Sequence, residues 1–397
     1  MQLLTMMQAT TTGGVGTSSN ASSCKARSGA VELPLHLTER ILCSMSPLES
    51  ARHAAVCKSW ASTVSARLAR PVPHLFACTP PGTNSDRRGL VLSVPLDGSG
   101  KPAIIIPSRV RASDTNGLRC IGAAPGSGRV AFAAGWWSSD VVLVDPVTGG
   151  GVHRVDVGEP CRLDPRHSRV LAGDAFFAVD GYTLALWRPD DDGHHGGEEE
   201  EAWSRCAVAG ATSSPAKNIV SAVNCNNGRF YLLHQDGSLS MVDATAPPPL
   251  RTARLPVERL VITDQFDGDT GHLVECDGEV LFVAAGFEVY RLNLNVKGQT
   301  WTKIKELPAD RALFVSPGSS FAVRASEMEG CRSNCIYFVA ERRPLCGDED
   351  GESSWGVYSM EDRRVLFDHV LVTQLGRGAA ELFWFLPRVN PSRRASL

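Results

Sequence analysis

Two cysteines have the spacing of half a zinc site. Cys331 and Cys335 form a C-x3-C pair, and thiolates are common zinc ligands. A structural zinc site needs four ligands, and the further candidates are Cys346 and the distant His369. We therefore interpret the pair as buried strand cysteines and expect no metal there.

Phosphate and divalent-ion sites are indicated equally weakly. Gly100-Lys101 would fit a phosphate-binding loop if a glycine stood five residues earlier and a hydroxyl residue followed. Pro95 and Pro102 occupy those positions. His194-His195 lies between acidic runs in a Gly-rich stretch with few apolar residues, which is typical of a solvated loop. We expect neither a cofactor nor a metal ion.

Motifs typical of enzymes are missing from the sequence. It contains no G-x-S-x-G elbow, no H-E-x-x-H pair and no Gly-rich dinucleotide turn. Its paired carboxylates lie in turns such as Asp267-Gly268-Asp269, where Asp is first of all a turn former. We therefore predict a non-catalytic protein whose function is binding.

Composition sets the class of protein that must carry this function. The chain has 397 residues, of which 43% are hydrophobic and 21% charged, and its net charge of −3 gives no reason to expect nucleic-acid binding. Its 37 Gly and 24 Pro indicate many turns and short strands. The 12 scattered cysteines are read as reduced thiols of a nuclear or cytoplasmic protein, and no apolar run is long enough for a membrane span.

Helical spacing of apolar residues is confined to one N-terminal segment. A first stripe follows Leu33-Pro34, and a second helix start is marked by a capping serine, a proline at the first helical position and a glutamate in Ser46-Pro47-Leu48-Glu49. A third stripe, spaced by four, ends before Pro71. The apolar positions are Leu37, Ile41, Leu42 and Met45 in the first helix, and Val56, Trp60, Val64 and Leu68 in the third. Helices this short need a partner to bury their apolar faces.

The same segment contains Leu33-Pro34, Ile41-Leu42, Pro47-Leu48, Arg52 and the run Val56-Cys57-Lys58-Ser59-Trp60. With these residues it resembles an F-box, although His36 stands where an acidic residue is common and Ala54-Ala55 is small. The resemblance implies that it binds a Skp-type adaptor, which links it to a cullin scaffold in a ubiquitin ligase. The implied adaptor contacts are Leu33, Pro34, Leu37, Ile41, Leu42, Pro47, Leu48, Val56, Cys57 and Trp60. Some of these must instead pack the helices together, and the sequence does not sort the two groups. The alternative is a helical cap without a partner.

Strand pairs recur through the rest of the chain, separated by turn residues. Their first strands begin near residues 89, 129, 174, 229, 279 and 335, so the repeat is about 40–56 residues long. A repeat of this length is typical of a β-propeller blade, and we predict an all-β propeller-like domain of about six blades. A β-sandwich array is the alternative, but it would have shorter turn spacing.

The C-terminal half carries a second resemblance, in Phe287–Arg291, Trp301, Leu313-Phe314, Ser319–Phe321, Asn334–Phe338, Gly356–Tyr358 and Phe383–Pro387. It is similar to a plant F-box family whose KIB-type, propeller-like region is known as domain of unknown function 295. The resemblance implies a small all-α F-box in front of a propeller. It implies no particular target.

We therefore expect a multi-domain chain: a disordered tail at residues 1–30, an F-box at 31–71, a propeller at 75–390 and a flexible tail at 391–397. The expected function is substrate recognition for a Skp–cullin–F-box ubiquitin ligase, with an unknown protein as target and no nucleic-acid or membrane partner. Two alternatives stay open. One is an adaptor-bound regulator that causes no degradation, and the other is a propeller enzyme or carbohydrate-binding module with a helical cap.

Overall fold

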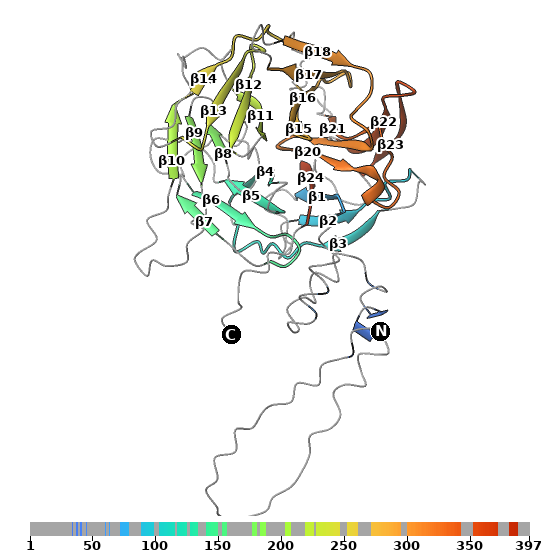
Figure 1. Cartoon of the computed structure of the whole chain (residues 1–397). Coiled ribbons are helices and arrows are strands. Elements are labelled where there is room, and N and C mark those ends of the chain that lie inside the picture. Colours follow the sequence, from blue (N-terminus) through green and yellow to red (C-terminus); the bar gives the residue numbers. More distant parts are fainter. Residues whose placement is uncertain are drawn as a thin grey trace, which may run out of the picture.

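The computed structural model of the chain describes part of the N-terminal segment and most of the strand-rich region. Its described residues are 34, 37–38, 40–41, 45, 60, 63, 72–78, 89–98, 103–115, 117–124, 128–133, 140–149, 153–156, 177–180, 183–187, 203–207, 219–225, 228–246, 252–260, 271–294, 300–342, 352–371 and 381–387. The described strands form six sheets arranged as a ring around a common axis (Figure 1). The β-propeller expected from the repeat length is therefore confirmed.

Three of the sheets come from the first half of the chain and one closing strand. The first contains β24 (Glu381–Phe385), β1 (His74–Cys78), β2 (Gly89–Ser93) and β3 (Ile104–Pro107). The second contains β4 (Arg119–Ala124), β5 (Arg129–Ala133), β6 (Asp140–Val144) and β7 (His153–Asp156). The third contains β8 (Phe177–Asp180), β9 (Thr183–Trp187) and β10 (Trp203–Ala207).

The other three sheets follow in chain order. One contains β11 (Ile219–Cys225), β12 (Arg229–His234), β13 (Leu239–Asp243) and β14 (Thr252–Arg254), and the next contains β15 (His272–Cys276), β16 (Glu279–Val283), β17 (Val289–Asn293) and β18 (Thr300–Ile304). The last has the order β20 (Ser319–Arg324), β19 (Arg311–Ser316), β21 (Cys335–Arg342), β22 (Glu352–Ser359) and β23 (Arg364–Val370). A 3₁₀ turn, η3 (Ala325–Glu327), follows β20. The expected blade count was about six. Among the described residues, five of the sheets have the four or five strands of a full blade, whereas the β8–β10 sheet has three described strands.

The ring is closed by its last strand. β24 pairs antiparallel with β1, so that Phe76 lies opposite Phe383 and His74 opposite Phe385. β1 is buried along its whole length and β24 at every residue except Glu381, which fits their nearly continuous apolar sequences. The first sheet is thus built from the two ends of the propeller region.

The innermost strand of the last sheet crosses close to the axis. β20 is joined to β19 by a tight hairpin, and β19 pairs in parallel with β21 on its other side. At the hairpin tip Gly318 has φ +72°, and a Cβ there would lie 2.8 Å from the carbonyl oxygen of Ile121 in β4. A Cβ on Gly122 would lie 2.7 Å from the carbonyl oxygen of Gly318. Glycine at both positions therefore lets the two backbones touch across the middle of the ring.

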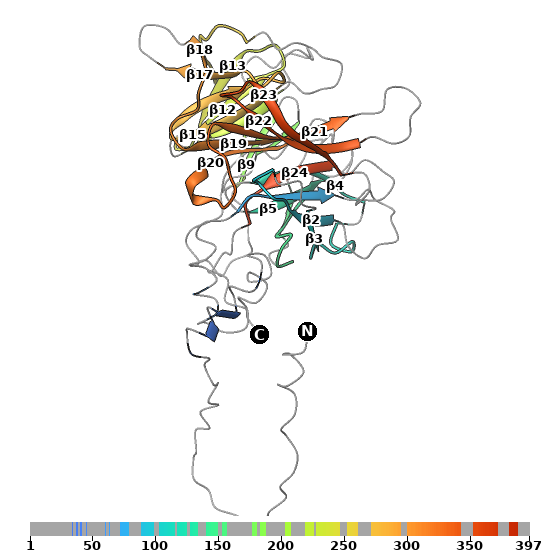
Figure 2. The same ribbon diagram turned by 90° about the vertical axis from the view of Figure 1, so that its right-hand side faces the viewer.

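Apolar residues between neighbouring sheets form the core. One cluster lies between the first two sheets and includes Phe76, Ile106, Cys120, Phe132 and Phe385. The described N-terminal residues lie beside the blade that contains β1, β2 and β3 (Figures 1 and 2). No helix among the described residues is long and apolar enough to cross a membrane.

Candidate functional site

Six of the described residues of the N-terminal segment have helical backbone, whereas Pro34 is not helical and Met45, which was expected in the first helix, lies in a bend. Leu37, Thr38, Arg40 and Ile41 are helical, as are Trp60 and Thr63. The backbone N–H groups of Leu37 and Thr38 donate to the carbonyl of Pro34, at 2.9 and 3.1 Å, so the first turn begins directly after this proline. The predicted contacts Leu33, Leu42, Pro47, Leu48, Val56 and Cys57 lie outside the described residues, as do the predicted terminal tails.

The described members of this segment fall into two groups by their exposure. Pro34 is exposed and Leu37 is 38% exposed, which is high for a large apolar side chain. Met45 and Trp60 are half-buried and pack against the apolar cluster between the first two sheets. The segment therefore has one side on the propeller and one apolar side turned outward.

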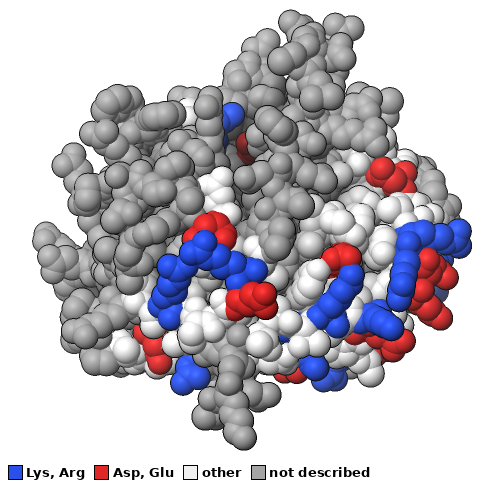
Figure 3. Space-filling view, turned by 90° about the horizontal axis from the view of Figure 1, so that it is seen from above, with Lys and Arg blue, Asp and Glu red and all other residues white. Residues whose placement is uncertain are grey.

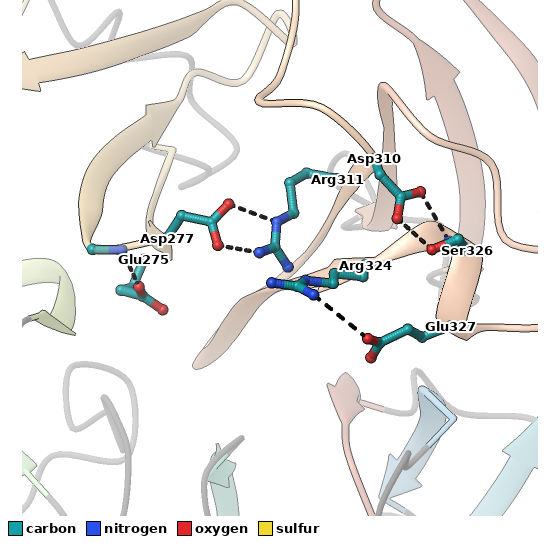
Figure 4. A network of polar contacts seen from close by, with 8 residues as sticks. Glu275, Asp277, Asp310, Arg311, Arg324, Ser326 and Glu327 are labelled. Atoms are coloured by element: carbon teal, nitrogen blue, oxygen red, sulfur yellow. Dashed lines mark hydrogen bonds and ion pairs between the residues drawn. The ribbon is translucent and has the colours of Figure 1, made fainter.

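A polar network lies where two neighbouring blades meet (Figure 4). It consists of Glu275, Asp277, Asp310, Arg311, Arg324, Ser326 and Glu327. Its residues come from the end of β15 and the turn after it, from the start of β19 with the residue before it, and from the end of β20 with η3. It therefore joins residues that lie up to about fifty positions apart in the chain.

Asp277 is positioned by a tight hairpin. β15 and β16 are joined by the two residues Asp277 and Gly278, with φ values of +53° and +80°, and Glu275 accepts a hydrogen bond from the Gly278 N–H at 2.7 Å. The turn directs the Asp277 carboxylate at Arg311, whose Nε donates to it at 2.7 Å and whose terminal nitrogen bonds the second oxygen. A bidentate pair of this kind fixes both orientation and distance.

Asp310 organises the second half of the network. Its carboxylate accepts hydrogen bonds from the hydroxyl and from the backbone N–H of Ser326, the latter at 2.9 Å. These bonds, led by the one from the hydroxyl, lower the pKa of Asp310 below its usual range. The guanidinium of Arg324 lies 3.8 Å from the carboxylate of Glu327, and both side chains are exposed. The network thus contains four carboxylates and two guanidinium groups, of which Arg324 is exposed and Arg311 is only 13% exposed.

The network is on the face of the ring where the chain enters the propeller. The loop after η3 and the start of β21 dock onto the turn that follows β2. Arg332, in the loop, donates to the carbonyl of Asp97 at 3.1 Å, and the hydroxyl of Tyr337, in β21, donates to the carbonyl of Leu96 at 3.0 Å. The turn after β2 is adjacent to the start of β1, because Leu92 is paired with Leu75. The N-terminal segment and the polar network therefore approach the propeller from the same face.

Positive and negative side chains are mixed on the side of the propeller that Figure 3 shows. Figure 3 shows Lys and Arg side chains interleaved with Asp and Glu, without a large area of one sign. Arg254 and Arg259 both lie 3.8 Å from Asp236, Arg291 lies 3.5 Å from Glu279, and Lys303 pairs with Glu288.

The cysteines considered for zinc are buried or half-buried thiols. Burial raises the pKa of Cys331 and of Cys335 to about 11, so both are protonated at neutral pH. His369 lies beside Trp355, with ring centroids 6.4 Å apart. Among the described residues there is no group of three or more His, Cys, Asp or Glu side chains arranged to hold a metal, while Cys346 and His194-His195 lie outside them.

Sequence reasoning did not find the polar network. Its turn residues gave a local signal, since Asp277-Gly278 is a typical hairpin dipeptide. The partner of Asp277 depends on how the blades pack, and no local pattern specifies it. The F-box pattern implies that Trp60 contacts the adaptor, and this stays a prediction. In the structure Trp60 also packs against the apolar cluster between the first two sheets, which no sequence pattern indicated.

Comparison with known proteins identifies two regions. The model of the KIB1-4 beta-propeller family matches residues 103–359, and the model of the F-box domain matches residues 31–67. The F-box protein At2g26160 of Arabidopsis thaliana is 28% identical over an alignment of 166 positions, which covers 36% of this chain and 47% of that protein. The chain thus aligns with about half the length of this curated relative.

Solved structures with a similar outline are distant. Apo AztD from Citrobacter koseri has a TM-score of 0.35 and 9% identity, covering 79% of this chain and 97% of that one. The WD40 domain of SCAP from fission yeast has a TM-score of 0.31 and 9% identity, covering 62% and 61% of the two chains.

Proposed function

Because the chain belongs to the KIB1-4 beta-propeller family and carries an F-box domain, we propose that it is the substrate-recognition subunit of a Skp–cullin–F-box ubiquitin ligase. The presence of both regions in one chain is the observation that carries this proposal. The F-box would bind a Skp-type adaptor, the propeller would hold a target protein, and a separate enzyme would supply the ubiquitin. The protein itself would act by raising the local concentration of the target near that enzyme.

The outward apolar side of the N-terminal segment supports the adaptor-binding half of the proposal. Pro34 and Leu37 are exposed in the free chain, and exposed apolar anchors of this kind commonly dominate helix-in-groove binding. The F-box pattern adds further proposed adaptor contacts that lie outside the described residues. These are Leu33, Leu42, Pro47, Leu48, Val56 and Cys57.

We propose the face with the polar network as the target-binding face. It presents charged and hydroxyl groups held by rigid strands and by hydrogen-bonded turns, an arrangement that favours specific recognition of a protein. A nuclear or cytoplasmic location is part of the proposal, because the described cysteines are free thiols. Microscopy of a tagged chain tests this, and a purely secretory distribution would contradict it.

Adaptor binding is the first experiment. The intact chain, a Leu33→Ala/Pro34→Ala double variant and Leu37→Ala are compared for binding to a purified Skp-type adaptor by calorimetry. Leu294→Ala is the matched control, because Leu294 has a similar exposure of 46% but lies on the propeller. The proposal predicts that the F-box variants lose at least about tenfold in affinity while Leu294→Ala does not. If the well-folded wild type does not bind the adaptor, the proposal is wrong.

A further inference from the structure

Met45 and Trp60 occupy a position that the F-box pattern does not explain. Both side chains are half-buried and pack against the apolar cluster between the first two sheets. This cluster contains residues from β1, β3, β4, β5 and β24, among them Phe76, Ile106 and Phe385. The two side chains therefore pack against a cluster to which two blades contribute, one of them through the closing strand of the ring.

The chain that links this segment to the propeller is also held in place. Val72 packs against the neighbouring core cluster, and Pro73 and His74 are buried. The Nδ1–H group of His74 donates to the carbonyl of Val72 at 2.6 Å. Proline fixes its own φ angle, so this short connection has little conformational freedom. The described part of the link therefore does not act as a flexible hinge.

A rigid joint between the F-box and the propeller requires apolar packing between them and a linking segment with little freedom. The packing of Met45 and Trp60 and the restrained link at Val72–His74 meet both requirements. A tryptophan contributes a large apolar area with few rotatable bonds, and it gives up little entropy when it is fixed. In contrast, Pro34 and Leu37, on the outward side, are exposed. The exposures thus sort the described F-box residues into outward anchors and inward packing residues.

We propose that Trp60, together with Met45, is a positioning residue that fixes the F-box on the propeller, and that the adaptor is bound by the side carrying Pro34 and Leu37. The meaning of this joint for ubiquitin transfer rests on the proposed function. A rigid receptor holds its target at one distance and one orientation from the enzyme that carries ubiquitin, whereas a loose receptor spreads both over a wide range.

Intramolecular distance is the direct test. Donor and acceptor dyes are placed in the full chain through unnatural amino acids at the exposed positions Arg40 and Lys305, because the twelve cysteines rule out selective thiol labelling. Single-molecule energy transfer should give one narrow distance distribution in the wild type and in Leu37→Ala. Trp60→Ala should broaden it by about twofold or more, and Trp60→Phe should restore most of the narrow distribution. An unchanged distribution in Trp60→Ala, or a broad one already in the wild type, would overturn the proposal.

Adaptor affinity provides the second measurement on the same variants. We expect Trp60→Ala to bind the adaptor within about threefold of the wild type and Leu37→Ala to lose about tenfold or more. Loss of adaptor binding in Trp60→Ala with an unchanged distance distribution would identify Trp60 as an adaptor contact instead, and the proposal would be wrong. If Trp60→Ala does not fold, as judged by circular dichroism, Met45→Ala takes its place with the same expected broadening. If the wild type does not bind any adaptor, the proposed function is wrong. The distance measurement would still show whether Trp60 fixes the F-box on the propeller.

Discussion

Arg311 and Asp277, thirty-four residues apart in the chain, bind each other through two parallel hydrogen bonds between neighbouring blades. The Arg311 side chain is only 13% exposed, and the Asp277 side chain is 45% exposed. The pair thus belongs to the packing of the two blades as much as to the surface.

Removing the charge of Asp277 should weaken this contact between blades. We expect Asp277→Asn to lower the free energy of unfolding by about 1–2 kcal/mol, because the mostly buried guanidinium keeps its hydrogen-bond donors but loses its bidentate carboxylate partner. Denaturant unfolding followed by fluorescence measures the change. The control is Glu288→Gln, which removes the exposed pair with Lys303 and should cost at most about 0.5 kcal/mol. Equal losses in the two variants would contradict the structural role of the Asp277 pair.

Adding a methyl group at the hairpin tip should be costly. Gly318→Ala places a Cβ 2.8 Å from the Ile121 carbonyl oxygen at a residue with φ +72°, so both a backbone clash and a strained conformation arise. We expect a loss of about 2–3 kcal/mol in the free energy of unfolding.

Two other glycines separate the causes of that loss. Gly117 has φ +72° with nothing within 4 Å of its Cβ position, so Gly117→Ala should cost about 1 kcal/mol, from strain alone. Gly286 has open space and no positive φ, so Gly286→Ala should be close to neutral. Thermal unfolding of the three variants should rank them in this order, and a Gly318→Ala variant as stable as Gly117→Ala would show that the backbones do not meet there.

Burial of His74 predicts a loss of stability in weak acid. Burial lowers the pKa of His74 from 6.5 to about 4, although its hydrogen bond to Val72 opposes this shift. Between these two pH values the unfolded chain binds a proton that the folded chain does not. Stability is therefore complete above about pH 6.5 and falls as the pH drops toward 4, by about 3 kcal/mol in all. Urea unfolding at pH 7 and pH 5 should show a smaller pH dependence in His74→Leu than in the wild type, and identical slopes would refute the assignment.

Burial should also protect the strand-end thiols from alkylation. It raises the pKa of Cys276 to about 12 and that of Cys225 to about 11, while the Cys225 thiol also donates to the carbonyl of Gly278 at 3.1 Å. Since the thiolate is the reactive form, N-ethylmaleimide at pH 7.5 should label these two residues only after unfolding. Peptide mass spectrometry resolves each site, and rapid labelling of either residue in the folded chain would contradict its burial.

Outer strand pairs could be predicted from the sequence, whereas the innermost strands could not. β12 with β13 and β16 with β17 are separated by clear turn residues, which is why the starts of β12 and β16, near residues 229 and 279, were predicted correctly. β4 and β24 are buried along nearly their whole length, and they lack the alternation of apolar and polar residues that identifies a half-buried strand. Parallel pairing of β19 with β21 was likewise not predictable, since it depends on a hairpin folding back toward the axis.

In the N-terminal segment, too, the sequence identifies the apolar positions but not the surface that each side chain contacts. A helical stripe identifies Trp60 and Leu37 as apolar positions, but both the propeller and an adaptor are apolar surfaces. Which of them each side chain meets depends on how the helices sit on β1 and its neighbours. The adaptor contacts outside the described residues therefore stay predictions from the F-box pattern.

The pairing of β24 with β1 has a consequence for the time at which the protein becomes usable. During synthesis, β1 leaves the ribosome some three hundred residues before its neighbour β24 does, and the first blade is therefore the last to be completed. The apolar cluster that receives Trp60 contains Phe383 and Phe385 of this late strand. A nascent or prematurely terminated chain therefore lacks part of the apolar cluster against which its F-box packs. The arrangement that would present a target to the ligase exists only in chains that have been translated through β24.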